Sequence, residues 1–125
     1  MKKILIIDDD KDLNRLTKIV LTHEGYEVEI LHDAESGINY ARVYKPDLIL
    51  MDVLSPGMRG TDAAKRIKTD DLSDQIQIIF LTASVSPRTK PWEEGLNVDG
   101  LHYPTIGKPY EIEKLLQTVN KVLGY

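Results

Sequence analysis

Short apolar runs alternate along the chain with segments whose apolar residues recur at helical spacing. The runs predict strands at residues 4–7, 26–31, 48–51, 76–81 and 101–106. The helical spacing predicts helices between Asp10 and Gly25, Ala34 and Lys45, Thr61 and Asp70, and Ile112 and Leu123. Run 48–51 is apolar throughout, which is typical of a strand buried on both faces of a sheet. Pro104 interrupts run 101–106 and makes it the least regular of the five.

The first helix is expected to pack on the sheet through an apolar face. Leu13, Leu16 and Val20, with Thr17 between, recur there at helical spacing. Asp10 or Asp12 is expected to cap its N-terminus, because a carboxylate accepts hydrogen bonds from the first free backbone N–H groups.

Strands that alternate with helices predict a parallel sheet covered on both faces by right-handed crossovers. We therefore expect an α/β fold, a flavodoxin-like (βα)5 doubly wound parallel sheet with strand order 2-1-3-4-5. This order places a crevice at the carboxyl ends of strands one and three. Pro87 and Pro91 predict that the helix after the fourth strand is short or irregular. The length suits one domain, residues 1–125.

Composition narrows the class of protein. Hydrophobic residues make up 42% of the chain and charged residues 29%, as in soluble globular proteins. No apolar stretch approaches the roughly 20 residues of a membrane span, and Met1-Lys2-Lys3 does not begin a secretory signal, so we expect a cytoplasmic protein without a membrane partner. The absence of cysteine excludes thiol catalysis. A net charge of -4 makes direct nucleic-acid binding unlikely as a function.

Carboxylates follow two strands that the expected fold brings together. Asp52 ends run 48–51, and Asp8, Asp9 and Asp10 end the first run. Carboxylates at one edge of a sheet repel one another unless a cation is present. We expect Mg²⁺, which Mn²⁺ can replace, with Asp9 and Asp52 as ligands and Asp8 linked through water. Asp10 is expected mainly to cap the first helix.

A hydroxyl and an ammonium complete this candidate site. Thr82 follows the fourth strand and Lys108, which precedes Pro109, follows the fifth. A carboxylate nucleophile, metal-binding acids, a hydroxyl donor and a cation suit phosphoryl transfer, which depends on positioning and charge neutralisation.

These features, in this order, resemble the receiver domains of two-component response regulators, and the resemblance spans essentially the whole chain. The residues that carry it are Asp8-Asp9, Asp52 followed by Pro56 and Gly60, Thr82-Ala83, and Lys108-Pro109. Each piece is weak alone, whereas the ordered set is highly specific. Because no output domain follows Tyr125, we expect a stand-alone receiver domain or one excised from a longer protein.

The resemblance implies a phosphoacceptor role for Asp52. The phosphoryl group would come from a histidine kinase, a phosphotransfer protein or a small phosphodonor. The resemblance also implies that Asp9 and Asp52 bind Mg²⁺ together with the backbone carbonyl of Leu54, while Asp8 acts mainly through water. The domain would catalyse only its own phosphorylation and dephosphorylation and would not be an enzyme with a separate substrate.

The resemblance further implies a switch. Thr82 would move to hydrogen-bond the phosphoryl group, Lys108 would pair with it, and the face of the fourth helix, fifth strand and last helix would bind a downstream protein. Receivers usually carry an aromatic residue three positions before the site lysine, where this chain has Thr105. Tyr103 is the nearest substitute, and segment 86–103 is longer than the family pattern.

Three alternatives remain open at this stage. The first is a phosphorylation-independent adapter that binds partners through segment 86–103. The second, less favoured, is a Mg²⁺-dependent phosphohydrolase using Asp8 and Asp10 as an acidic pair. Flavin binding is weaker still, because the three aspartates would repel the cofactor phosphate. His23, His32 and His102 have no companion at metal-ligand spacing, so ordinary roles are expected for them.

Overall fold

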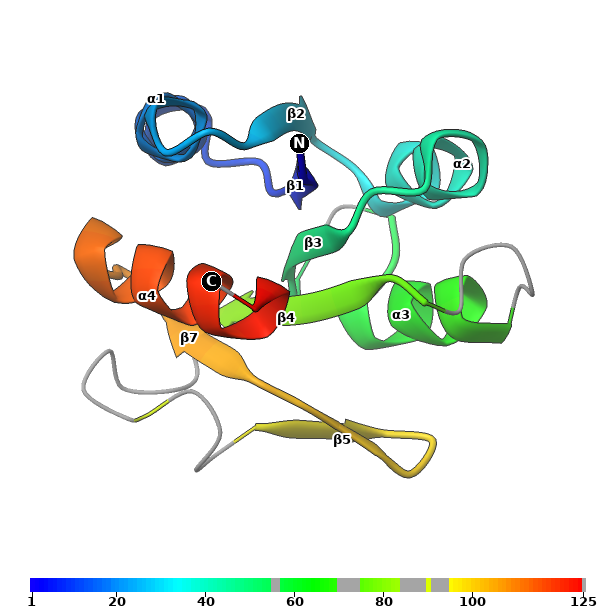
Figure 1. The fold of residues 1–125 in the computed structure, drawn as a ribbon. Helices are drawn as coiled ribbons and strands as arrows, with labels where there is room; N and C mark the ends of the chain where they lie inside the picture. Colours follow the sequence, from blue (N-terminus) through cyan, green and yellow to red (C-terminus); the bar gives the residue numbers. More distant parts are fainter. Residues whose placement is uncertain (55–56, 70–74, 84–89, 91–94, 125) are drawn as a thin grey trace.

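A five-stranded parallel sheet forms the centre of the computed structural model, which describes residues 1–54, 57–69, 75–83, 90 and 95–124. The strand order is β2-β1-β3-β4-β7, as Figure 1 shows. These strands are β1 (Lys3–Ile7), β2 (Glu27–Leu31), β3 (Leu48–Asp52), β4 (Gln77–Thr82) and β7 (Thr105–Gly107). With β7 as the fifth strand of the sheet, the flavodoxin-like order predicted from the sequence is confirmed.

Helices cover both faces of the sheet (Figure 1). On one face lie α1 (Lys11–His23) and α4 (Ile112–Leu123), and on the other lie α2 (Ala34–Tyr44) and α3 (Gly60–Thr69). Successive β1 residues point to opposite faces, so Ile6 joins the core under α1 and α4, whereas Leu5 joins the core under α2 and α3. All five β3 residues are buried, as expected for a central parallel strand. Among the described residues, no helix is long and apolar enough to cross a membrane.

Helix α1 is rotated from the orientation predicted by its apolar residues. Leu16, expected in the packed face, is 49% exposed, whereas Asn14, Thr17 and Leu21 are buried. The two polar residues are buried because each has a tertiary hydrogen-bond partner, described below. Asp10 caps the helix as predicted: its Oδ1 accepts a hydrogen bond from the Leu13 N–H at 3.1 Å.

The predicted strand 101–106 is two strands rather than one. β6 (Leu101–Tyr103) pairs antiparallel with β5 (Leu96–Val98), and the pair forms a separate hairpin. Pro104 divides β6 from β7, because proline has no N–H to donate to a ladder. Its carbonyl still accepts a hydrogen bond from the Phe80 N–H at 3.0 Å. The chain therefore leaves the hairpin and enters the main sheet at this proline.

The predicted helix after β4, with Pro87 and Pro91, falls on residues 84–89 and 91–94 and lies outside the described residues. The described part of the long segment before Tyr103 is the β5–β6 hairpin. In Figure 1 this hairpin extends beyond β7, at the end of the sheet opposite β2.

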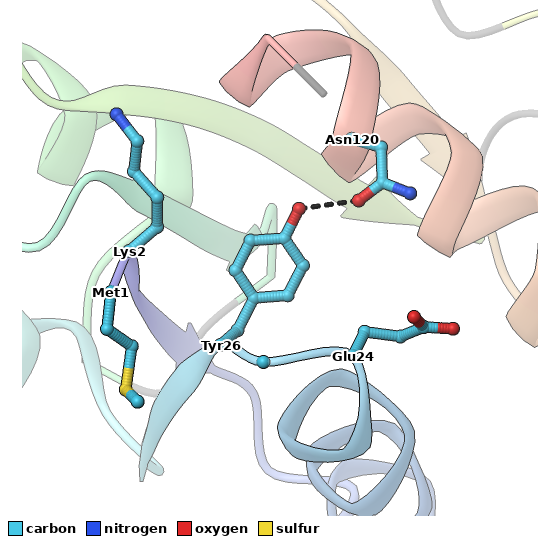
Figure 2. A pocket seen from close by; sticks show the side chains of 6 residues that line it. Met1, Lys2, Glu24, Tyr26 and Asn120 are labelled. Atoms are coloured by element: carbon cyan, nitrogen blue, oxygen red, sulfur yellow. Dashed lines mark hydrogen bonds between the residues drawn. The ribbon is translucent and has the colours of Figure 1, made fainter.

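A tyrosine joins the start of β2 to α4 at the amino ends of the strands. The Tyr26 hydroxyl donates a hydrogen bond to Asn120 Oδ1 at 2.5 Å. Figure 2 shows this contact beside a pocket of about 250 Å³ that Lys2 and Glu24 also line. The pocket lies at the edge of the sheet opposite the ends of β1 and β3 that carry Asp8 and Asp52.

Candidate functional site

Four strands deliver the predicted site residues to one edge of the sheet. Asp8 follows β1, Asp52 ends β3, Thr82 ends β4 and Lys108 follows β7. Because the strands are parallel, their carboxyl ends meet at the same edge. The Lys108 N–H donates to the Thr82 carbonyl at 2.9 Å and holds the last of these turns against β4.

Three carboxylates form a group that can hold a cation. One oxygen each from Asp8, Asp9 and Asp52 lies within 4.8 Å of the others. Asp8 is fully buried and Asp52 is 8% exposed, whereas Asp9 is exposed to solvent. Hard divalent ions prefer such oxygen ligands and keep several water molecules, which the exposed side at Asp9 can accommodate. The donor set therefore fits Mg²⁺.

Lys108 supplies the positive charge within this group. Its Nζ lies 2.5 Å from Asp8 Oδ2 and 3.5 Å from Asp52 Oδ2. Partial burial lowers the pKa of Lys108, but the ion pairs with Asp8 and Asp52 outweigh burial and leave the pKa above its ordinary value. Lys108 is therefore charged at neutral pH. Apart from this ammonium, Asp8 Oδ2 has no partner among the described residues.

The backbone around Asp52 is held by its own turn. The Leu54 N–H donates to Asp52 Oδ1 at 3.1 Å, and the Gly60 N–H donates to the Val53 carbonyl at 2.8 Å. A Cβ added at Gly60 would lie 2.5 Å from the Asp52 carbonyl oxygen and 3.0 Å from Met51 Cγ. Only glycine fits this close approach of the start of α3 to the end of β3. The Leu54 side chain is 72% exposed beside the site.

Two residues for which the sequence predicted no role in the site hold the backbone of Asp8. The Asn14 Nδ2 donates to the Asp8 carbonyl at 2.8 Å, and His32 Nδ1 contacts the same oxygen at 3.1 Å. A carbonyl only accepts, so His32 donates from Nδ1. His32 was expected to have an ordinary role rather than to bind a metal, and its contact is a structural hydrogen bond that joins the end of β2 to the Asp8 backbone. The sequence pattern carries no signal for Asn14, because its burial depends on a partner outside its own helix.

A further hydrogen bond anchors the turn after Lys108. The hydroxyls of Tyr110 and Thr17 lie 2.7 Å apart, both buried, and join this turn to α1. Burial raises the pKa of Tyr110 to about 12; the hydrogen bond to Thr17 opposes the rise, whereas the charges of Asp8 and Asp10 add to it. Tyr110 therefore stays neutral well above neutral pH.

The predicted switch residues lie on three different strands: Thr82 on β4, Thr105 on β7 and Tyr103 on β6. Thr82 is 6% exposed at the carboxyl edge, and Thr105 is 2% exposed opposite Phe80. Tyr103 is 7% exposed and packs edge-to-face on Phe80 with ring centroids 5.5 Å apart. Tyr103 and Phe80 belong to the core under α2 and α3. Tyr103 is thus connected to Thr82 through Phe80, two residues earlier on β4.

Some predicted residues lie outside this description. Pro56, and residues 86–89 and 91–94 of the long segment, are not among the described residues. Among those that are described, Asp10 caps α1 through Oδ1.

Comparison with known proteins identifies the family. The family model for the response regulator receiver domain matches residues 4–120. The chain is 35% identical to the uncharacterized transcriptional regulatory protein YkoG of Bacillus subtilis over 96% of its own length and 50% of that protein. It is 32% identical to the response regulator ArlR of Staphylococcus haemolyticus, over 98% of its own length and 53% of that protein. The chain thus spans about half the length of the curated relatives it matches.

Solved structures agree with this assignment. The chemotaxis response regulator CheY4 of Vibrio cholerae superimposes with a TM-score of 0.83 at 30% identity, covering 98% of each chain. The chain belongs to the response regulator receiver domain family, the signalling domains of two-component systems.

Proposed function

We propose that this domain accepts a phosphoryl group on Asp52 and passes the signal on by a change in the surface that a partner binds. The observation that carries the proposal is the Lys108 ammonium shared between buried Asp8 and Asp52, at the edge where β1, β3, β4 and β7 end. Asp52 is the carboxylate of this pair with the longer contact to Lys108 and with some exposure to solvent.

In the proposed reaction an Asp52 carboxylate oxygen attacks the phosphorus of the donor. The new O–P bond gives an acyl phosphate, while the bond from phosphorus to the donor nitrogen or oxygen breaks and its electron pair leaves with the donor. Lys108 stabilises the phosphoryl oxygens as charge develops, and Thr82 donates a hydroxyl hydrogen bond to one of them. Dephosphorylation returns the carboxylate when water attacks the phosphorus.

Asp9 and Asp52 are the proposed direct ligands for Mg²⁺, with the Leu54 carbonyl as a third and Asp8 acting through water. When bound, the ion supplies a positive charge that offsets the carboxylates and the incoming phosphoryl oxygens. Asn14 and His32 keep the Asp8 backbone in place for this role.

The phosphoryl donor is proposed to be a histidine kinase or a phosphotransfer protein, as for other response regulators. Phosphorylation replaces one carboxylate charge by about two negative charges, so additional donors are attracted to the site. We propose that Thr82 moves toward the phosphoryl group and that Phe80 and Tyr103 carry the movement to β7 and α4, where a downstream protein binds. No separate substrate is turned over.

Mass spectrometry after incubation with Mg²⁺ and a small phosphodonor tests the proposal. We expect a single phosphoryl adduct in the wild type, none in Asp52→Asn, and an adduct in the matched control Asp62→Asn, whose carboxylate is on α3. The absence of an adduct with every donor and cation tried would refute the proposal. Repeated hydrolysis of a phosphoester would instead support the phosphohydrolase alternative, although Asp10 already caps α1.

A further inference from the structure

A groove between α1 and β2 is not used by the proposed phosphoryl chemistry. It has a volume of about 320 Å³, within the range of small-molecule sites, and β2 is an edge strand of the sheet. Its lining residues are Lys11, Asn14, Arg15, Lys18, Ile30 and His32. The α1 members recur at helical spacing, so they share one side of the helix.

The charge of this groove is positive. Lys11, Arg15 and Lys18 are exposed, and none of the three has an ion pair within the part of the chain that the structure describes. No carboxylate lines the groove. The acidic residues Glu27 and Glu29 of β2 alternate with the buried Val28 and with Ile30, so they point to the α2 face of the sheet. Three lysine or arginine side chains around one groove suit an anion.

One of the residues that line the groove, Asn14, carries a buried acceptor that lacks a donor among the described residues. Asn14 is 1% exposed, and its Oδ1 has no hydrogen-bond partner among the described residues. Rotating the Asn14 amide by half a turn about its last side-chain bond would not satisfy Oδ1, because Nδ2 would then lose its hydrogen bond to the Asp8 carbonyl. An unsatisfied buried acceptor costs free energy that a ligand O–H or N–H would recover.

We propose that this groove binds a small phosphorylated molecule. The phosphate would accept hydrogen bonds from Arg15, Lys11 and Lys18, and a hydroxyl, amino or P–OH hydrogen would be donated to Asn14 Oδ1. Where the ligand carries an organic group, the apolar side of that group would rest on Ile30. Free phosphate, a sugar phosphate and a nucleoside monophosphate share this chemistry. An acidic peptide is less suited, since only a compact donor reaches an acceptor that is almost fully buried.

The groove is joined to the metal-binding carboxylates by its own residues. Asn14 and His32 both line it, and both donate to the Asp8 carbonyl. A ligand bound to Asn14 therefore acts on the residue that positions Asp8. We expect ligand binding to shift the backbone amide resonances of Asp8 and Asp9 as well as those of the groove.

Nuclear magnetic resonance titration tests this site. Inorganic phosphate, glucose 6-phosphate and adenosine monophosphate are added separately to ¹⁵N-labelled protein in EDTA, so that no divalent ion draws phosphate to the carboxylates. We expect at least one probe to bind saturably with a Kd below about 1 mM, with shifts in Lys11 to Lys18 and Ile30 to His32. Glucose and adenosine are the uncharged controls. No phosphodonor is present, so the result is independent of phosphorylation at Asp52.

Matched variants decide whether the groove is responsible. Arg15→Gln is expected to weaken binding about tenfold, because it removes a charged hydrogen-bond donor. Arg42→Gln makes the same substitution on α2, on the opposite face of the sheet, and is expected to bind as the wild type does. The proposal is overturned if all three phosphorylated probes fail to saturate or if both variants weaken binding equally.

Discussion

Lys108 lies closer to Asp8 than to Asp52: its Nζ is 2.5 Å from the first carboxylate and 3.5 Å from the second. The fully buried Asp8 thus holds the ammonium at the site, and the Asp52 oxygen keeps a weaker contact. This division suits the nucleophile role proposed for Asp52, because it would leave the carboxylate available while its charge is partly balanced.

The first prediction concerns this pair. Lys108→Met should lower the free energy of unfolding by about 2 to 4 kcal/mol, because it leaves the buried Asp8 carboxylate without a cation. Added Mg²⁺ should recover part of the loss in the variant, since the ion replaces the missing charge. Urea denaturation with and without Mg²⁺ measures both effects.

Lys65→Met is the control for that experiment, because Lys65 pairs with Asp99 at 4.0 Å and both side chains are exposed. It should change the free energy of unfolding by less than about 1 kcal/mol. Equal losses in the two variants would show that the Lys108–Asp8 contact does not stabilise the fold.

A second prediction concerns Gly60. Gly60→Ala should destabilise the protein by about 1 to 3 kcal/mol and weaken metal binding, since the added methyl group displaces the Asp52 backbone. Gly100→Ala is the comparison: its φ is +83°, and nothing lies within 4 Å of an added Cβ. It should cost about 1 kcal/mol from backbone conformation alone and leave Mg²⁺ affinity unchanged. Metal titration by intrinsic fluorescence distinguishes the two variants.

A third prediction follows from the pKa of Tyr110, which burial raises from 10.0 to about 12. The unfolded chain ionises this tyrosine first, so the free energy of unfolding should fall as the pH rises from 10 toward 12, by roughly 2 to 3 kcal/mol in all. Tyr110→Phe should lose that part of the pH dependence. Urea midpoints between pH 9 and about 11.5 test this.

Lys108 contributes a slope of the same sign in both proteins of that experiment. Its folded pKa is raised, so its stabilising effect is present below its ordinary pKa of 10.5 and is lost as the pH rises through the folded value. The difference between wild type and Tyr110→Phe removes this shared slope. Parallel curves for the two proteins would contradict the assignment to Tyr110.

A fourth prediction addresses the amino ends of the strands. Tyr26→Phe and Asn120→Ala should each destabilise the protein, and the double variant should reveal a coupling energy of about 1 kcal/mol from the shared hydrogen bond. Phosphorylation of Asp52 should proceed at the wild-type rate in all three variants. A slower rate would mean that this contact is coupled to the opposite edge of the sheet.

The sequence predicted the positions of those residues that depend on the local pattern of apolar and polar side chains. Run 48–51 identifies a central strand because only a strand with helices on both sides is apolar throughout. Given parallel strands, the placement of Asp8 and Asp52 at one edge follows from topology alone. The pattern of apolar residues was therefore sufficient for a parallel sheet with helices on both faces. The strand order 2-1-3-4-5 also depended on the carboxylates that follow strands one and three.

The features that could not be predicted depend on contacts between residues in different helices and strands. Leu16 follows the helical spacing of apolar residues but is exposed. Asn14 and Thr17 are buried instead, with hydrogen bonds to the Asp8 carbonyl and the Tyr110 hydroxyl. Helical spacing cannot foresee a polar residue whose partner lies in another element. Pro104 predicted an irregular strand. The pairing of β5 with β6 was not predicted, because it depends on residues that carry no strong strand pattern.

The contact between Lys108 and Asp8 joins the turn after the last strand of the sheet to the end of the first. A nascent chain that has emerged only as far as β4 already contains the acidic residues but not Lys108, so without a bound divalent ion its carboxylates repel one another. We therefore expect the acidic edge to be stable in the absence of such an ion only after β7 has been added beside β4. Chains truncated before Lys108 are therefore expected to remain sensitive to proteolysis. The charge balance of the site would thus distinguish completely folded chains from incomplete ones.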